Sequence, residues 1–167
     1  MTPATASRVR IGPDDFDVSR EIAALRAQDR SVGAVAAFVG TVRDRSAGDG
    51  VADTVGMELE HYPGMTERAI ESMIDEAQRR FRIRGVRIVH RVGPLAPGDQ
   101  IVLVVVTSAH RGDAFQACEF LMDYLKTQAP FWKKEHRPDG SSAWVDARVA
   151  DDDALARWGI EAGNAGR

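Results

Sequence analysis

The sequence has 167 residues, 44% of them hydrophobic and 28% charged, which fits one soluble globular domain with its own core. The formal net charge of -3 excludes a protein that coats nucleic acid over its whole surface, so a basic site must be local. The single cysteine, Cys118, excludes an internal disulfide and a cysteine-rich zinc site; with no apolar run of signal-peptide or membrane length, we expect a cytoplasmic protein that contacts no membrane.

The first part of the chain alternates between strand and helix patterns. Arg8 to Gly12 is typical of a short strand, and Val18 to Gln28 has apolar residues at helical spacing behind Asp17, a good capping residue. The apolar, β-branched run Gly33 to Val42 predicts a buried strand. The Gly/Asp/Ser-rich stretch Arg43 to Asp53 predicts a loop.

The middle of the chain predicts three strands and one helix. Thr54 to Tyr62 alternates apolar and polar residues, as a half-buried strand does, and Pro63-Gly64 then opens an amphipathic helix. Val86 to Val92 follows as a strand, and Pro94 to Gln100 is expected to be a turn. Ile101 to Ser108 is the most strand-like run in the chain.

The last third predicts a helix and a hairpin. Helix signals resume after Gly112-Asp113 and end at Pro130, with one apolar stripe formed by Phe115, Cys118, Leu121, Met122 and Leu125. Phe131 to Glu135 and Ala143 to Ala147 are typical of two hairpin arms around the turn Pro138-Asp139-Gly140.

The order of these patterns predicts one α+β domain over residues 1–150, since no internal repeat or linker interrupts them. Residues 151–167 are expected to form a C-terminal tail with a short helix.

Polar residues gather at the ends of the predicted elements, where functional sites are usually built. Four such clusters stand out: Thr41-Val42-Arg43, His110-Arg111, Lys126 and Lys133-Lys134-Glu135. His110 and Arg111 precede a helix N-terminus, whose free N–H groups favour anions. The four histidines of the chain lack the spacing of metal ligands, so we expect no metal site.

Each cluster also has a plain structural interpretation. Arg43 begins a polar loop and as a lone arginine is usually solvated, while Lys126 at a helix C-terminus complements the helix dipole. In an extended segment, Lys133 and Lys134 point to opposite faces, so at most one of them shares a pocket. The clusters form one anion site only if the ends of the elements converge.

Five segments of the chain, in order, resemble the large, catalytic subunit of molybdopterin synthase over roughly Val9 to Trp144. The matching segments are FVGTVRD (Phe38 to Asp44), LEHYPGMTE (Leu59 to Glu67), HRVGPLAPGD (His90 to Asp99), TSAHR (Thr107 to Arg111) and MDYLKTQAPFWKKE (Met122 to Glu135).

The resemblance implies an α/β hammerhead-like fold with a mixed or antiparallel sheet and packed helices. It also implies a homodimer with a small ubiquitin-like sulfur-carrier subunit at each end, a heterotetramer in total, whose carrier tail ends in a Gly-Gly thiocarboxylate. The expected reaction converts cyclic pyranopterin monophosphate into molybdopterin by adding two sulfurs, with no permanently bound cofactor. Glycines of that tail are expected to follow the arm Phe131 to Glu135 by strand-like pairing.

The resemblance further implies which residues act. The substrate-binding positions are Thr41, Val42, Arg43, His110, Arg111, Lys126, Lys133, Lys134 and Glu135, with threonine at 41 where some relatives carry lysine. Lys126 is the expected general acid or base, or a transient acyl acceptor, and Lys133 is the expected partner of the thiocarboxylate. Two interpretations from other classes stay open: a non-catalytic phosphate-binding module and a scaffold that only dimerises.

Overall fold

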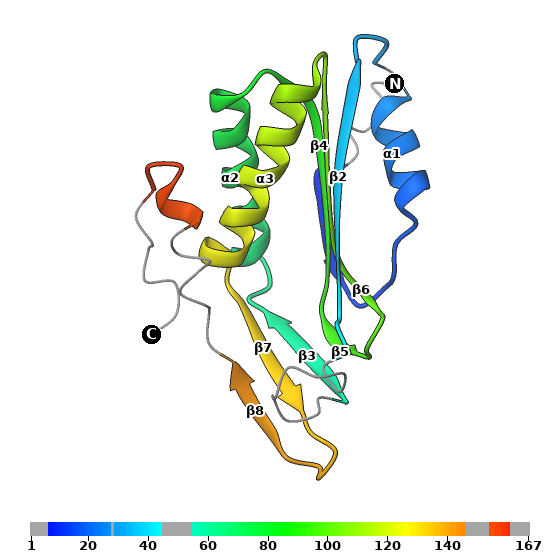
Figure 1. Ribbon diagram of the computed structural model, residues 1–167, viewed down its shortest axis with the longest axis vertical. Helices are drawn as coiled ribbons and strands as arrows, with labels where there is room; N and C mark the ends of the chain where they lie inside the picture. Colours follow the sequence, from blue (N-terminus) through cyan, green and yellow to red (C-terminus); the bar gives the residue numbers. More distant parts are fainter. Residues whose placement is uncertain (1–6, 28, 45–54, 146–153, 161–167) are drawn as a thin grey trace.

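The computed structural model describes residues 7–27, 29–44, 55–145 and 154–160, and Figure 1 shows their arrangement. The helices are α1 (Val18–Arg26), α2 (Met65–Arg80) and α3 (Arg111–Gln128). The strands are β1 (Val9–Gly12), β2 (Ala34–Thr41), β3 (Gly56–His61), β4 (Ile83–Arg91), β5 (Gly93–Leu95), β6 (Gln100–Ser108), β7 (Phe131–His136) and β8 (Ser142–Val145).

The strands of the described residues form two four-stranded sheets. Sheet A has the order β1-β4-β6-β2, in which β1 and β4 are parallel and the other neighbours antiparallel. Sheet B has the order β5-β3-β7-β8 and is antiparallel throughout. This arrangement confirms the predicted α+β class with mixed and antiparallel sheets.

Sheet A is covered by helices on both faces, with α2 and α3 on one side and α1 on the other (Figure 1). The central strand β6 is buried on both faces because alternate side chains enter different layers. Val104 and Val106 pack into the large core under α2 and α3, whereas Leu103 and Val105 pack with Phe16 on the α1 side. The strand predicted for the apolar run Ile101 to Ser108 is therefore confirmed.

Strand β2 is less buried than its apolar sequence predicts. It forms an edge of sheet A, and Val35 and Phe38 keep 36% and 39% of their surface exposed. Ala36 faces the core below α3, but α1 packs on β4 and β6 rather than over β2. The expectation of a buried strand was wrong because Val35 and Phe38 lie on opposite faces of an edge strand, and neither face is fully covered.

The apolar stripe predicted for α3 is correct except at its first residue. Cys118, Leu121 and Leu125 are buried, but Phe115 is 64% exposed. The buried face is centred near Leu121, and Phe115 lies about 120° away from it around the helix axis at 3.6 residues per turn. The helix also begins at Arg111, earlier than Gly112-Asp113 suggested.

Two further boundaries differ from the sequence patterns. The segment expected to be a turn, Pro94 to Gln100, begins inside strand β5, which pairs with β3. Strand β4 starts at Ile83, before the predicted Val86. The predicted hairpin of β7 and β8 is confirmed, and Gly140, with φ of 83°, closes its turn by donating to the Arg137 carbonyl.

Several expectations fall partly on residues outside the described ranges: the loop residues 45–53, Thr54, residues 146–147 and most of the tail. Of the tail, residues 154–156 are helical. Trp158 lies edge-on to Phe120 with ring centroids 5.6 Å apart, and its indole N–H donates to Asp123 at 2.7 Å. Among the helices that the structure describes, none has the length and apolar character needed to cross a membrane.

Candidate functional site

A cleft of about 520 Å³ opens between the two sheets at the C-terminal end of α3. Its apolar walls come from both sheets and from the last turns of the helix: Phe38, Val39, Val42, Met57, Leu59, Ile101, Val102, Met122, Leu125, Ala129, Phe131 and Val145. Four of these residues belong to or pack on a separate small core: Val42, Met57, Leu59 and Ile101. The cleft thus has the apolar lining typical of a ligand site.

Charged side chains from three separate segments line this cleft. Arg43 follows β2, Lys126 lies on the last turn of α3, and Lys133 lies in β7. Lys133 Nζ is 3.6 Å from Glu135 Oε1, so the carboxylate is placed to orient this amine. Within the described ranges, neither Arg43 nor Lys126 forms a side-chain hydrogen bond or ion pair, which leaves both cations available to an anion.

The corner at Pro130 brings Lys126 and Lys133 to the same cleft. A proline disfavours helical backbone in the residue before it, and Ala129 is accordingly extended, with ψ of 131°. The Thr66 hydroxyl fixes the corner by donating to the Pro130 carbonyl at 3.0 Å. Strand β7 then begins at once at Phe131, and its alternation turns Phe131, Lys133 and Glu135 toward the cleft.

Lys134 lies on the other face of β7, as expected for neighbouring residues of a strand. Its ammonium group is 5.5 Å from the centre of the Trp144 ring, an exposed cation–π contact. Lys134 does not line the cleft in this chain, whereas Lys133 does.

His110 and Arg111 lie at the opposite end of α3 from Lys126. At 1.5 Å per residue the helix separates Arg111 from Lys126 by about 22 Å. Both side chains are exposed, and neither lines the cleft. Of the predicted site residues, the cleft of a single chain contains Thr41, Val42, Arg43, Lys126, Lys133 and Glu135. The other three, His110, Arg111 and Lys134, lie outside it.

The segment Thr41-Val42-Arg43 reaches the cleft through a break in the sheet register. A bulge between Gly40 and Thr41 pairs Thr41 with Gln100, out of step with the preceding pair of Gly40 and Val102. Val42 is buried and bonded through its backbone on both sides, donating to the Asp99 carbonyl at 2.9 Å and accepting from the Gly98 N–H at 2.8 Å.

His90 is a cleft residue that sequence reasoning missed. Its ring stacks on Phe131 with centroids 3.9 Å apart and planes 17° from parallel. Burial lowers the pKa of His90 to about 4, and nearby His61 adds to the shift, so the ring is neutral near pH 7. A signal was present in the sequence, because His90 alternates with Val86 and Ile88 and so shares the inward face of the strand with these apolar residues.

Cys118 lies away from the cleft lining, in the core between α3 and sheet A. Its thiol is 4.0 Å from the Val104 carbonyl, and burial raises its pKa to about 11. The thiol is therefore protonated and unreactive near neutral pH, which agrees with the place of Cys118 on the apolar stripe of the helix.

Comparison with known proteins gives a consistent result. Residues 11–128 match the family described as MoaE protein. The chain is 58% identical over 157 residues to the molybdopterin synthase catalytic subunit of Ralstonia nicotianae, covering 94% of this chain and 87% of that protein. The solved molybdopterin biosynthesis MoaE protein from Burkholderia ambifaria has 59% identity and a TM-score of 0.79, covering 93% of this chain and 99% of that one.

A more distant solved chain shares the fold. It comes from a protein–protein complex of subunits 1 and 2 of molybdopterin-converting factor from Helicobacter pylori, with 20% identity and a TM-score of 0.68, covering 84% of this chain and 91% of that one.

Proposed function

Because the chain belongs to the MoaE family of molybdopterin synthase catalytic subunits, we propose that its cleft is where cyclic pyranopterin monophosphate receives two sulfurs. The observation that carries this proposal is the convergence of Arg43, Lys126 and Lys133 on one apolar-walled cleft. The pterin is its substrate, and no permanently bound cofactor is needed. The reaction is expected in the cytoplasm, where Cys118 stays reduced.

The cleft suits two anions at once. The substrate carries a cyclic phosphate, and the sulfur donor brings a thiocarboxylate. Charge-assisted hydrogen bonds to such groups strengthen when apolar walls exclude water. Arg43, which has no ion-pair partner among the described residues, is suited to the phosphate because its guanidinium binds oxyanions in a fork.

Lys126 and Lys133 divide the remaining work. Lys126 is not held by a carboxylate in the described part of the chain, so its amine is free to transfer a proton or to accept the acyl group transiently. Lys133 lies 3.6 Å from Glu135, a contact that orients its ammonium group toward the thiocarboxylate. In this division Glu135 acts on the substrate through Lys133.

The sulfur donor is a small carrier subunit whose tail must enter this cleft. The Helicobacter pylori protein of the same fold was solved as a complex of two subunits. Strand pairing of the tail along β7, as first expected, does not fit, because β3 occupies one edge of β7 and β8 pairs with Lys133–His136 on the other. The tail instead enters over the side-chain face that carries Lys133 and Glu135.

A homodimer explains how His110 and Arg111, which lie outside the cleft of their own chain, take part in the site. Strand β2 exposes its outer edge, begins beside Ser108 next to His110, and ends at Thr41 beside the cleft. Antiparallel pairing of β2 with its copy places the start of one strand against the end of the other. His110 and Arg111 of each chain then approach the cleft of the partner copy and help to grip the pterin and its phosphate.

Turnover measurements test the proposed function. The purified chain is incubated with cyclic pyranopterin monophosphate, with or without a thiocarboxylated carrier, and molybdopterin is quantified. Product only with the carrier supports a synthase subunit. Binding of the pterin without product supports a phosphate-binding module, and neither binding nor product supports a scaffold. Light scattering at micromolar concentration checks the dimer, and a monomer mass contradicts the two-chain site.

A bulky substitution of the last glycine of the carrier tests the entry of the tail. A large side chain at the end of the tail would fill space in the cleft of about 520 Å³ that the pterin needs, so turnover is expected to stop while the globular part of the carrier still docks. Unchanged turnover with the bulky carrier contradicts this route.

A further inference from the structure

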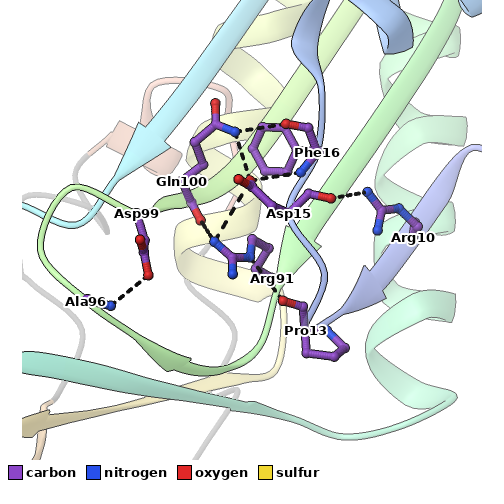
Figure 2. Close-up of polar contacts among 8 residues, drawn as sticks. All are labelled: Arg10, Pro13, Asp15, Phe16, Arg91, Ala96, Asp99 and Gln100. Carbon is purple, nitrogen blue, oxygen red and sulfur yellow. Dashed lines mark hydrogen bonds and ion pairs between the residues drawn. The ribbon is translucent and has the colours of Figure 1, made fainter.

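A polar cluster lies at the end of β4, next in sequence to the cleft residue His90, and Figure 2 shows its members. The Arg91 guanidinium donates to the carbonyls of Pro13 at 3.2 Å and Gln100 at 3.0 Å, and lies 3.9 Å from the Asp15 carboxylate. The Gln100 amide donates to Asp15 at 2.9 Å and to the Phe16 carbonyl at 2.9 Å. Arg91 thus ties the loop before α1 to the first residue of β6.

This cluster connects directly to the segment that carries Arg43. Gln100, whose carbonyl accepts from Arg91, is the ladder partner of Thr41. The preceding turn binds Val42 through two backbone hydrogen bonds, from Val42 N–H to the Asp99 carbonyl and from Gly98 N–H to the Val42 carbonyl. The Asp99 carboxylate closes that turn by accepting from the Ala96 N–H at 2.8 Å (Figure 2).

The position of Arg43 therefore depends on backbone contacts. Its side chain forms no hydrogen bond or ion pair with any other described residue, so its direction follows from Thr41 and Val42. Those residues are in turn held by Gln100 and the turn before it. Within the described ranges, Arg91, whose side chain is 14% exposed, is the charged group that donates to the Gln100 carbonyl.

We propose that Arg91 is a positioning residue for Arg43: through Gln100 and the turn at residues 96–99, it fixes where the cleft presents its arginine to an oxyanion. The inference rests on the proposed function for the identity of that oxyanion, the substrate phosphate. The mechanical link itself is independent of the reaction. Asp15 supports the link by accepting from Gln100 while facing the Arg91 guanidinium.

The chain offers a matched control on the same strand. Arg84 of β4 also forms an ion pair, with its Nε 2.8 Å from Asp29, but lies at the far end of β4 from the cleft. Arg84→Met removes an arginine and an ion pair without touching Gln100 or Val42. Arg91→Lys keeps the charge but cannot donate in two directions from one planar group.

The first measurement is amide hydrogen exchange in the full-length protein. Arg91→Met is expected to raise the exchange rates of the Val42 and Gly98 N–H groups roughly tenfold or more, because the turn opens locally. Exchange of amides in the central strand β6 is expected to stay slow, which shows that the fold is intact. Arg84→Met leaves the Val42 and Gly98 rates unchanged. Unchanged rates in Arg91→Met overturn the inference, whatever the protein catalyses.

The second measurement is a kinetic double-mutant cycle with the thiocarboxylated carrier. Arg91→Met is expected to raise KM for the pterin roughly tenfold, the loss expected for a misplaced charged hydrogen bond, with a smaller change in kcat. In an Arg43→Ala background the same substitution is expected to raise KM no further, because the group it positions is gone. Additive effects of Arg91→Met and Arg43→Ala overturn the inference.

If Arg91→Met folds poorly, a milder variant allows the same measurements. Asp15→Ala changes an exposed side chain and removes the acceptor of the Gln100 amide. It is expected to shift Val42 exchange and KM in the same direction by less, and Arg91→Lys is expected to fall between wild type and Arg91→Met. Failure of the wild type to make molybdopterin refutes the proposed function, whereas the exchange result decides the link on its own.

Discussion

The two ends of α3 carry similar cationic clusters, yet they differ in what surrounds them. At the C-terminal end, Pro130 turns the chain into β7 within two residues, and Lys126 joins Lys133 in an apolar-walled cleft. At the N-terminal end, His110 and Arg111 stay exposed and line no cleft of their own chain. The difference shows that residue type alone does not reveal which cationic cluster lies in a cleft of its own chain.

The largest expected effect lies at the C-terminal end. Lys126→Ala is expected to fold and bind the carrier but to lose about 10²- to 10⁴-fold in rate, the contribution typical of a general acid or base. Single-turnover measurements with a saturating carrier check the rate, and a thermal melt checks the fold. Full activity in a folded Lys126→Ala protein refutes its assigned role.

The N-terminal end is tested by mixing two inactive variants. If His110 and Arg111 act on the partner copy, then Arg111→Ala and Lys126→Ala damage different halves of each site. Random pairing of the two variants after refolding together is expected to restore about a quarter of the wild-type activity, because one of the two sites in a mixed dimer is intact. No recovery, with mixed dimers confirmed by mass spectrometry, would falsify the two-chain site.

Local signals in the sequence predicted well the structure around the C-terminal end of α3. Pro130 marks the helix end and Pro138-Asp139-Gly140 marks the hairpin, and both act within a few residues of the chain. Strand alternation also predicted that only one of Lys133 and Lys134 faces the cleft. The sequence did not predict features that depend on contacts between segments far apart in the chain.

Strand β2 and helix α3 illustrate that limit. The apolar run of β2 is compatible with a central or an edge strand, and only its place beside β6 shows that Val35 is exposed. Phe115 fits the spacing of the stripe, but the small residues Ala114 and Ala117 let the helix approach the sheet along a different face. Strand β5, a three-residue Gly-Pro-Leu segment, is defined only by its pairing with β3.

His90, beside the C-terminal end, gives the next largest effect. Below pH 6.5 the unfolded chain takes up a proton at this residue, whereas the folded chain does so only near the lowered pKa of His90, about 4. Stability linked to His90 is therefore complete above pH 6.5 and is lost as the pH falls toward 4, by about 3 kcal/mol over the full range.

His90→Phe checks this dependence, because it removes the titrating group and retains a ring against Phe131. Urea unfolding between pH 7.5 and 4 is expected to show a shallower loss of stability than in the wild type. The difference in the free energy of unfolding between the two proteins at pH 7.5, where His90 is neutral in the folded and unfolded states, serves as the reference. Equal slopes for the two proteins contradict a neutral, buried His90.

The smallest expected effect is that of substituting Cys118, midway along α3. This residue belongs to the buried core and not to the cationic clusters at the two ends of the helix. The product gains two sulfurs, and this chain has one cysteine, whose thiol is buried and whose pKa is raised to about 11. Such a thiol offers almost no thiolate, so the sulfur is expected to come from outside this chain. Cys118→Ala is expected to keep near-normal transfer and to lose about 1 kcal/mol of stability from the smaller side chain. Measuring it with the same carrier preparation as Lys126→Ala makes the contrast direct, and a well-folded but inactive Cys118→Ala protein contradicts an external source of sulfur.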